Sequence, residues 1–289
     1  MKLFDEGLNW YKGNTHMHTT ISDGRLAPED AIELYRAKGY DFLAITDHRI
    51  MSYSRMDGNI LLTGGVEFDY MLADQCIHII GIGMMGEPKL DPPMRGASAQ
   101  DAIDAINSLD GLAILAHPAW SLNTPEQILR LHGFDATEIY NSVSGVHESR
   151  RPDSSLIVDM LGARGLFLPL IADDDVHYYD RDRCHAWIMV QAEDATRESL
   201  LPAIRRGDFY ATEGPEVHLR VEGDEAVITC SPCREVAVFS DAVWVDHRMI
   251  EGEDLTEVRV PVVKYEHFVR VQVTDRAGNR AWTNCAVLR

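Results

Sequence analysis

Residues 14 to about 206 alternate between short apolar runs and amphipathic segments, a pattern typical of alternating strands and helices. Apolar runs at 42–45, 112–116 and 168–172 have the length of buried strands. Helix starts are marked by a proline in the first turn at 26–30, and by a threonine cap before a proline at 124–127. About seven such units over about 200 residues predict parallel strands that close into a barrel.

The pattern changes after about Gly214. Several segments rich in β-branched residues alternate apolar and polar positions, and turns separate them: 217–221, 226–229, 236–239, 258–260 and 268–273. This pattern predicts a small antiparallel β module. Because no Gly/Ser-rich linker precedes it, we expect the module to pack directly on the barrel. The predicted domains are a barrel at 1–213 and the β module at 214–289.

Histidines and acidic residues recur where the predicted strands of the barrel end. His16 and His18 are two positions apart, so on a strand both rings lie on one face. Strand ends meet at one mouth of a barrel, which places such side chains close together. The predicted metal ligands are His16, His18, Asp23, His48, Glu67, His78, His117, Asp175 and His177. Imidazole and carboxylate ligands suit zinc, iron or manganese, so the pattern predicts a multinuclear metal site and hydrolytic chemistry.

Other acidic residues near the ligands have supporting roles in this prediction. Asp175 shares the face of His177, whereas Asp174 points the other way. We therefore expect Asp174, and likewise Asp47, to orient a ligand histidine rather than bind a metal. Glu67, Asp175 and His177 are the predicted catalytic groups, with Glu67 suited to bridge two cations through its two oxygens.

Substrate contacts are predicted from position and charge. Glu138 and Asn141 bracket the end of another barrel strand, where they would contact the substrate or support a ligand. A phosphate needs cations or donors beyond the metals, and Arg49 and Arg183 lie beside the ligand motifs. Each arginine could equally be an ordinary surface residue. His147 is a further candidate for substrate contact.

The formal net charge of -19 narrows the range of partners. Binding a nucleic-acid backbone requires a basic surface, so a nucleic-acid polymer is not an expected partner. An anionic small substrate stays compatible with this charge, because bound metals can make the mouth of an acidic protein electropositive. The expected partner is therefore a small phosphorylated substrate.

The location is predicted to be cytoplasmic. No run of about 18 apolar residues predicts a membrane span, and residues 1–6 show no apolar region typical of a signal peptide. The 5 cysteines are scattered, as expected of reduced thiols. Cys230 and Cys233 have the spacing of a redox motif, but no second pair accompanies them, so we assign them no redox or zinc role.

Taken together, the ligand motifs resemble those of the PHP (polymerase and histidinol phosphatase) family. The resemblance spans about residues 12–213, and it rests on residues 14–24, 45–48, 65–67, His78, 116–118 and 174–177. Segments 206–215 and 281–284 resemble the subgroup that includes carbaryl-hydrolase-like proteins. The resemblance implies a distorted, TIM-like (β/α)7 barrel that binds two or three divalent metals.

The family pattern also implies how the ligands divide among the metals. One metal would be bound by His16, His18, Glu67 and Asp175; a second by Asp23, His48 and His177; a third by Glu67, His78 and His117. Histidinol-phosphatase-like members often have histidine at the position of Asp23. The carboxylate here resembles the nucleotide and generic phosphoesterase branches instead.

These observations lead to three functional hypotheses. The first is a metal-dependent phosphoesterase that hydrolyses a small phosphomonoester or nucleotide with a metal-activated hydroxide. The second is a metal-dependent hydrolase of carboxylic or carbamate esters. The third is a non-catalytic binding protein that the metals only stabilise. The metal site favours the first, and the sequence leaves open the metal, the general acid and the oligomeric state.

Overall fold

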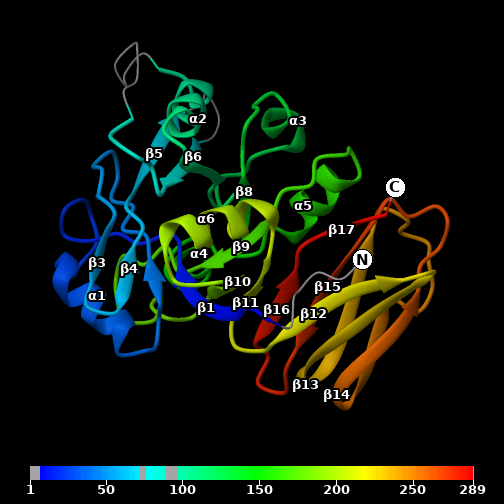
Figure 1. Ribbon diagram of the computed structural model, residues 1–289. Coiled ribbons are helices and arrows are strands. Elements are labelled where there is room, and N and C mark those ends of the chain that lie inside the picture. The colour runs from blue at the N-terminus through cyan, green and yellow to red at the C-terminus, as the bar shows by residue number, and fades with distance from the viewer. Residues whose placement is uncertain (1–6, 72–75, 89–96, 289) are drawn as a thin grey trace.

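The computed structural model describes residues 7–71, 76–88 and 97–288. As predicted, strands and helices alternate over the larger, N-terminal part of the chain (Figure 1). One sheet in this part contains β5 (Gly65–Met71), β6 (Cys76–Ile82), β7 (Leu112–Leu115), β8 (Ala136–Asn141) and β9 (Leu170–Asp173), in that order. Its middle and last strands are nearly fully buried, as expected for continuous apolar runs.

A second, longer sheet begins in the same part of the chain. It contains β1 (Asn9–Asn14), β2 (Phe42–Leu43), β3 (Arg55–Asp57), β4 (Ile60–Leu62), β10 (Trp187–Ala192) and β11 (Phe209–Thr212). Strand β1 pairs in parallel with β2 and antiparallel with β10. The sheet therefore mixes both directions.

The strands do not close into the predicted barrel of parallel strands. Their hydrogen bonds form two sheets, and both sheets are open. Strands β7, β8 and β9 are parallel, but β5 and β7 both run antiparallel to β6. Only residues 72–75 separate β5 from β6 in the sequence. Parallel neighbours need a crossover of a dozen or more residues, so this short connection joins antiparallel strands. The predicted mixed α/β class is confirmed, but the predicted closure of the strands into a barrel is not.

The two helix starts predicted at 26–30 and 124–127 are confirmed by α1 (Pro28–Arg36) and α3 (Pro125–Ile128). The other described helices are α2 (Ala99–Ser108), α4 (Ser142–Val146), α5 (Ser155–Gly162) and α6 (Arg197–Arg206). Ser98 and Asp101 form a capping box at the start of α2. Gly207 ends α6 with a left-handed φ of 77°, which glycine adopts without strain. Within the described ranges, no helix is both long enough and apolar enough to span a membrane.

The C-terminal residues form antiparallel strands as predicted, except that the segments 226–229 and 236–239 belong to one long strand. The strands are β12 (Val217–Glu222), β13 (Glu225–Ser240), β14 (Met249–Pro261), β15 (Phe268–Thr274), β16 (Arg280–Thr283) and β17 (Ala286–Val287). They lie together beside the α/β part (Figure 1). Strand β16 pairs with β11, so the long sheet has the order β12-β13-β15-β16-β11-β10-β1-β2-β4-β3. The domain boundary between residues 213 and 214 stays a prediction. The backbone hydrogen bonds between β11 and β16 cross this boundary.

The two parts share buried contacts, as expected for a module that packs directly on the α/β part. Trp282 of β16 is fully buried in the core that includes Ile139 and Ile188. Arg270 of β15 is also fully buried, and its Nε and Nη2 donate to the two carboxylate oxygens of Asp159 on α5, at 2.6 and 2.7 Å. A buried arginine requires such a partner, because an isolated charge away from water is costly.

Candidate metal centre

Two ligand-bearing segments lie side by side just beyond strand ends. His16 and His18 follow β1, and Asp175 and His177 follow β9. The residues between them, Met17 and Val176, are fully buried and form an isolated parallel bridge. In extended backbone, successive side chains point to opposite faces, so burying these two apolar residues turns all four polar side chains the other way.

The first group of ligand atoms is compact. The Nε2 atoms of His16 and His18 lie 3.1 Å apart, and each is 3.1 to 3.3 Å from both Glu67 Oε2 and Asp175 Oδ1. Among the described residues, these two buried carboxylate oxygens have no hydrogen-bond partner. An unsatisfied buried acceptor is costly, and a cation between the four atoms would satisfy both. The residues therefore fit the metal that the sequence predicts.

Asp23 lies at the centre of a second group. Its oxygens are 3.4 Å from His18 Nδ1, 3.6 Å from His177 Nε2 and 3.7 Å from His48 Nε2. The ligand atoms of this set all lie within 4.8 Å of one another. The Asp23 side chain is 53% exposed, so this end of the site is open to solvent. Apart from the addition of His18, this is the second ligand set implied by the family pattern.

Glu67 links these groups to a third. Its Oε1 atom lies 2.8 Å from His78 Nδ1 and 3.4 Å from His117 Nε2, while Oε2 faces His16 and His18. His48 Nδ1 also lies 3.1 Å from Oε2. One carboxylate thus presents its two oxygens to different sets of imidazoles. That arrangement suits a ligand shared between two cations, as predicted for Glu67.

Neighbouring charges in the cluster favour the ionised forms of His16, His78 and Glu67. Burial alone would lower the pKa of His16, but the carboxylates of Asp175, Glu67 and Glu138 raise it well above its ordinary value. His78 behaves in the same way: burial opposes protonation, and Glu67 with Cys76 raises the pKa to about 10. Burial would raise the pKa of Glu67, and the imidazoles lower it instead. Bound cations would replace these protons as the neutralising charges.

Glu138 and Asn141 support ligands. Glu138 is fully buried and accepts three hydrogen bonds, from His16 Nδ1 at 2.7 Å, from the His117 backbone N–H at 2.8 Å and from Asn141 Nδ2 at 2.7 Å. Asn141 Nδ2 also donates to Asp175 Oδ2 at 3.1 Å. Neither residue lines the cavity, and their hydrogen bonds favour the predicted alternative, in which they support the ligands.

The predicted roles of Asp47 and Asp174 also change. Asp47 accepts hydrogen bonds from the backbone and hydroxyl groups of Thr19 and Ser22, at 2.7 to 3.2 Å. It therefore orders the loop that carries Asp23, without contacting a ligand imidazole. Asp174 accepts from Tyr35, Ser142 and the backbone N–H groups of residues 184–186. Both of its oxygens are thereby used, so its expected contact with a ligand histidine is wrong.

Two ligands have strained backbone conformations. His117 has φ 26° and Asp175 has φ 49°, in the left-handed region that favours glycine. Such strain persists where the surrounding structure fixes the residue, and it often occurs at functional sites. Glu138 and Asn141 supply that restraint here, because each bonds to one of the two residues.

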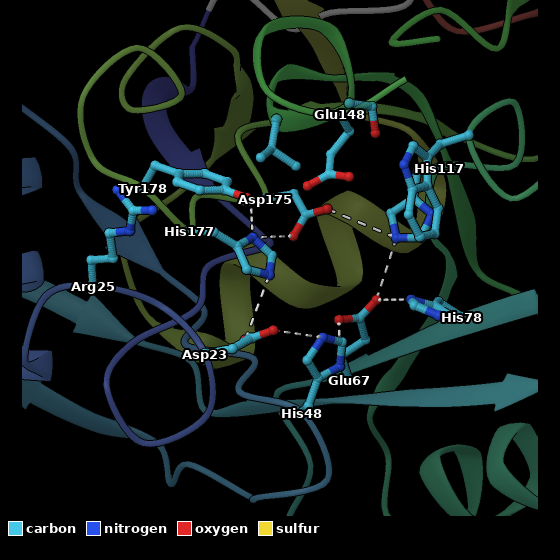
Figure 2. A pocket seen from close by; sticks show the side chains of 13 residues that line it. Asp23, Arg25, His48, Glu67, His78, His117, Glu148, Asp175, His177 and Tyr178 are labelled. Carbon is cyan, nitrogen blue, oxygen red and sulfur yellow. Dashed lines mark hydrogen bonds and ion pairs between the residues drawn. The ribbon is translucent and has the colours of Figure 1, made fainter. Parts of the chain in front are cut away.

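The cluster opens into a cavity of about 400 Å³ (Figure 2). Its wall includes seven predicted ligands and several residues that the sequence analysis missed. The missed residues are Arg25, Trp120, Val143, Ser144, Glu148 and Tyr178. Arg25 lies over the Tyr178 ring, with its guanidinium carbon 4.4 Å from the ring centroid. Its position two residues after Asp23 was the available signal.

The other predicted substrate contacts lie outside the cavity wall. The guanidinium of Arg49 forms an ion pair with Asp69, with Nε 2.7 Å from Oδ1. Arg183 is exposed and does not line the cavity. His147 pairs with Asp180 at 2.6 Å and stacks on the Tyr178 ring. Their predicted substrate contacts therefore stay predictions, and the arginine found in the cavity wall is Arg25.

Comparisons with known proteins extend the fold assignment. No protein-family model matches the chain, and no curated protein matches it. The fold is similar to that of a two-domain protein from Bacteroides vulgatus, described as containing a predicted PHP-like metal-dependent phosphoesterase, with a TM-score of 0.54 and 14% identity. That match covers 98% of this chain and 97% of the other. It shows a shared fold.

A second solved structure is similar over a shorter span. It is an amidohydrolase from Chromobacterium violaceum with bound sulfate and no metal, 19% identical, with a TM-score of 0.41. The match covers 59% of this chain and 89% of the other. The predicted resemblance to the carbaryl-hydrolase-like subgroup stays a prediction.

Proposed function

We propose that this protein is a metal-dependent phosphoesterase that hydrolyses a small phosphomonoester or nucleotide. One observation carries the proposal: Glu67 Oε2 and Asp175 Oδ1 are buried, lack hydrogen-bond partners among the described residues, and face two imidazole nitrogens. These ligand types suit zinc, iron or manganese. Two or three such ions would fill the three groups around Glu67.

The chain's own residues have distinct tasks in this proposal. When bound, the divalent ions supply Lewis acidity, which neutralises phosphoryl oxygens and makes water easier to deprotonate. Glu138 holds the proton of His16 on Nδ1, so Nε2 is free to bind an ion. Arg25 offers a phosphoryl oxygen a further cation. Trp120, beside His78 and His117, and Tyr178, near His177, pack against the organic part of the substrate.

The charge of the site favours a phosphate over a neutral ester. A phosphomonoester dianion spreads its charge over several oxygens, and each nearby cation stabilises it. Within the described residues, Arg25 lines the cavity without an ion-pair partner, so its charge is available to an anion. A carboxylic or carbamate ester, the second candidate, would gain little from that arginine.

We also propose the setting in which the enzyme acts. The α/β part is an open, distorted relative of a (β/α)7 barrel, with a division from the β module near residues 213 and 214. The substrate is a free small molecule in the cytoplasm. A nucleic-acid polymer or a membrane is not part of the proposal, given the net charge of -19.

The test compares esters and arginines. Metal-loaded protein is assayed with p-nitrophenyl phosphate, a nucleoside monophosphate and p-nitrophenyl acetate. We expect higher kcat/KM for the phosphates and competitive inhibition by inorganic phosphate. Arg25→Ala should raise KM for the phosphates, whereas Arg49→Ala, the matched control outside the cavity, should not. Faster hydrolysis of the acetate, without inhibition by phosphate, would favour the second candidate.

A further inference from the structure

Glu148 lines the cavity but belongs to none of the groups of metal-ligating side chains found among the described residues. In Figure 2 its carboxylate extends into the cavity from the side opposite Asp23 and His48. Over the described ranges, the carboxylate forms no hydrogen bond or ion pair with protein. It is therefore a free acidic group in the reaction space that the metal centre does not use.

The helix before Glu148, α4, is fixed to the metal centre at its start, and Glu148 is fixed to the helix. Asn141 caps the start of this helix by accepting from Ser144 N at 3.2 Å, while its amide donates to Asp175. At the other end, the Glu148 backbone N–H donates to Val143 O at 3.1 Å. The helix and its following residue thus keep a constant position relative to the ligands.

The residue before Glu148 adds a second anchor. The His147 ring stacks on Tyr178, with centroids 4.1 Å apart, and its Nε2 lies 2.6 Å from Asp180. Tyr178 directly follows the ligand His177 in the chain. His147, predicted from the sequence to contact substrate, therefore connects Glu148 to the ligand loop.

Hydrolysis of an alkyl phosphate requires a proton for the leaving oxygen, and few groups in the cavity can supply it. The carboxylates of Glu67, Asp175 and Asp23 face ligand imidazoles at 2.8 to 3.6 Å, so the proposed metal sites already use them. The proposed role of Arg25 is to bind a phosphoryl oxygen. Tyr178 offers a phenol, which is a weaker acid than a carboxyl group. A carboxylic acid is better matched to the task.

We propose that Glu148 is the general acid that protonates the leaving group, an assignment that rests on the proposed phosphoesterase function. A lone pair of a water oxygen forms the new P–O bond. The bond from phosphorus to the leaving oxygen breaks, and that oxygen keeps the electron pair and takes the proton of Glu148. The attacking water loses its proton to solvent, and Glu148 regains one from solvent. The products are an alcohol and inorganic phosphate.

The test uses leaving groups that differ in their need for a proton. Wild type and Glu148→Gln are compared on ethyl phosphate, whose alkoxide is a poor leaving group, and on p-nitrophenyl phosphate, whose phenolate leaves unaided. We expect Glu148→Gln to lower kcat on ethyl phosphate by about 10²- to 10⁴-fold, with a much smaller loss on p-nitrophenyl phosphate. Glu148→Asp should recover part of the loss, and metal content should match wild type.

Other outcomes overturn the assignment. Equal losses on both esters, no loss on either, loss of metal, or a rise in KM alone would each show that Glu148 is not the proton donor. If Tyr178→Phe changes the relative kcat on the two esters and Glu148→Gln behaves like wild type, the proton donor is the phenol of Tyr178. If wild type hydrolyses neither ester, the proposed function itself fails, and the assignment fails with it.

Discussion

Replacing Glu138 by glutamine tests how the metal centre is held together. The three groups that face this buried side chain are all hydrogen-bond donors: His16 Nδ1, the His117 N–H and Asn141 Nδ2. A carboxylate accepts from all three with its two oxygens. A glutamine amide keeps one acceptor and turns the other oxygen into a donor. At least one donor must then face another donor, or His16 must change its tautomer.

The expected cost follows from this mismatch. A buried polar group left without its partner costs about 1–3 kcal/mol. Residues that hold a metal-binding histidine by its second nitrogen contribute about 10- to 100-fold in metal affinity. A factor of ten corresponds to about 1.4 kcal/mol, so the two figures agree. We therefore expect Glu138→Gln to weaken metal binding by about 10- to 100-fold.

The assay is a metal titration against a competing chelator, followed by kinetics at saturating metal. Glu126→Gln, at an exposed glutamate that pairs with Arg164, is the matched control. With the metal sites filled, Glu138→Gln should keep a KM close to that of wild type. Normal metal affinity combined with a raised KM would refute this reasoning, and would restore the substrate contact that the sequence predicted for Glu138.

Other perturbations separate the parts of the site and of the fold. His18→Ala should lower metal content and abolish hydrolysis, because this ring faces two of the ligand groups. The control His132→Ala, at an exposed position, should change neither property. Elemental analysis and a phosphatase assay measure the two properties. A chain that ends at Gly214 should aggregate, as measured by light scattering, because it lacks the fully buried Trp282. In metal-free protein, the raised pKa of His78 stabilises the fold fully below its unfolded value of about 6.5. This stabilisation should be lost as pH rises toward about 10, so the urea midpoint should fall over that interval.

The ligand positions could be predicted because they depend on local periodicity. The two-residue spacing of His16 with His18, and of Asp175 with His177, needs only extended backbone between them, and the structure supplies it through the bridge of Met17 to Val176. His117 follows the end of β7 as predicted, whereas Glu67 and His78 lie inside β5 and β6. These predictions required no knowledge of which segments meet elsewhere in the fold.

The residues around the ligands were harder to predict because their roles depend on distant segments. Asp174 is occupied by backbone groups of 184–186, which return to it only in the folded chain. Arg25 reaches the cavity because Asp47 folds the loop at 19–22 toward it. Barrel closure likewise depends on how strands pair, and the short connection before β6 reverses that strand. Sequence periodicity does not report such long-range pairings.

The most direct test of the central claim is a metal titration of chelated protein with p-nitrophenyl phosphate hydrolysis as the readout. Zinc, iron(II) and manganese are added separately, and bound metal is measured at each point. The account predicts that activity is absent without metal and reaches its maximum only when at least two ions are bound per chain. Full activity with one ion or none would contradict the claim that this cluster is a multinuclear catalytic centre.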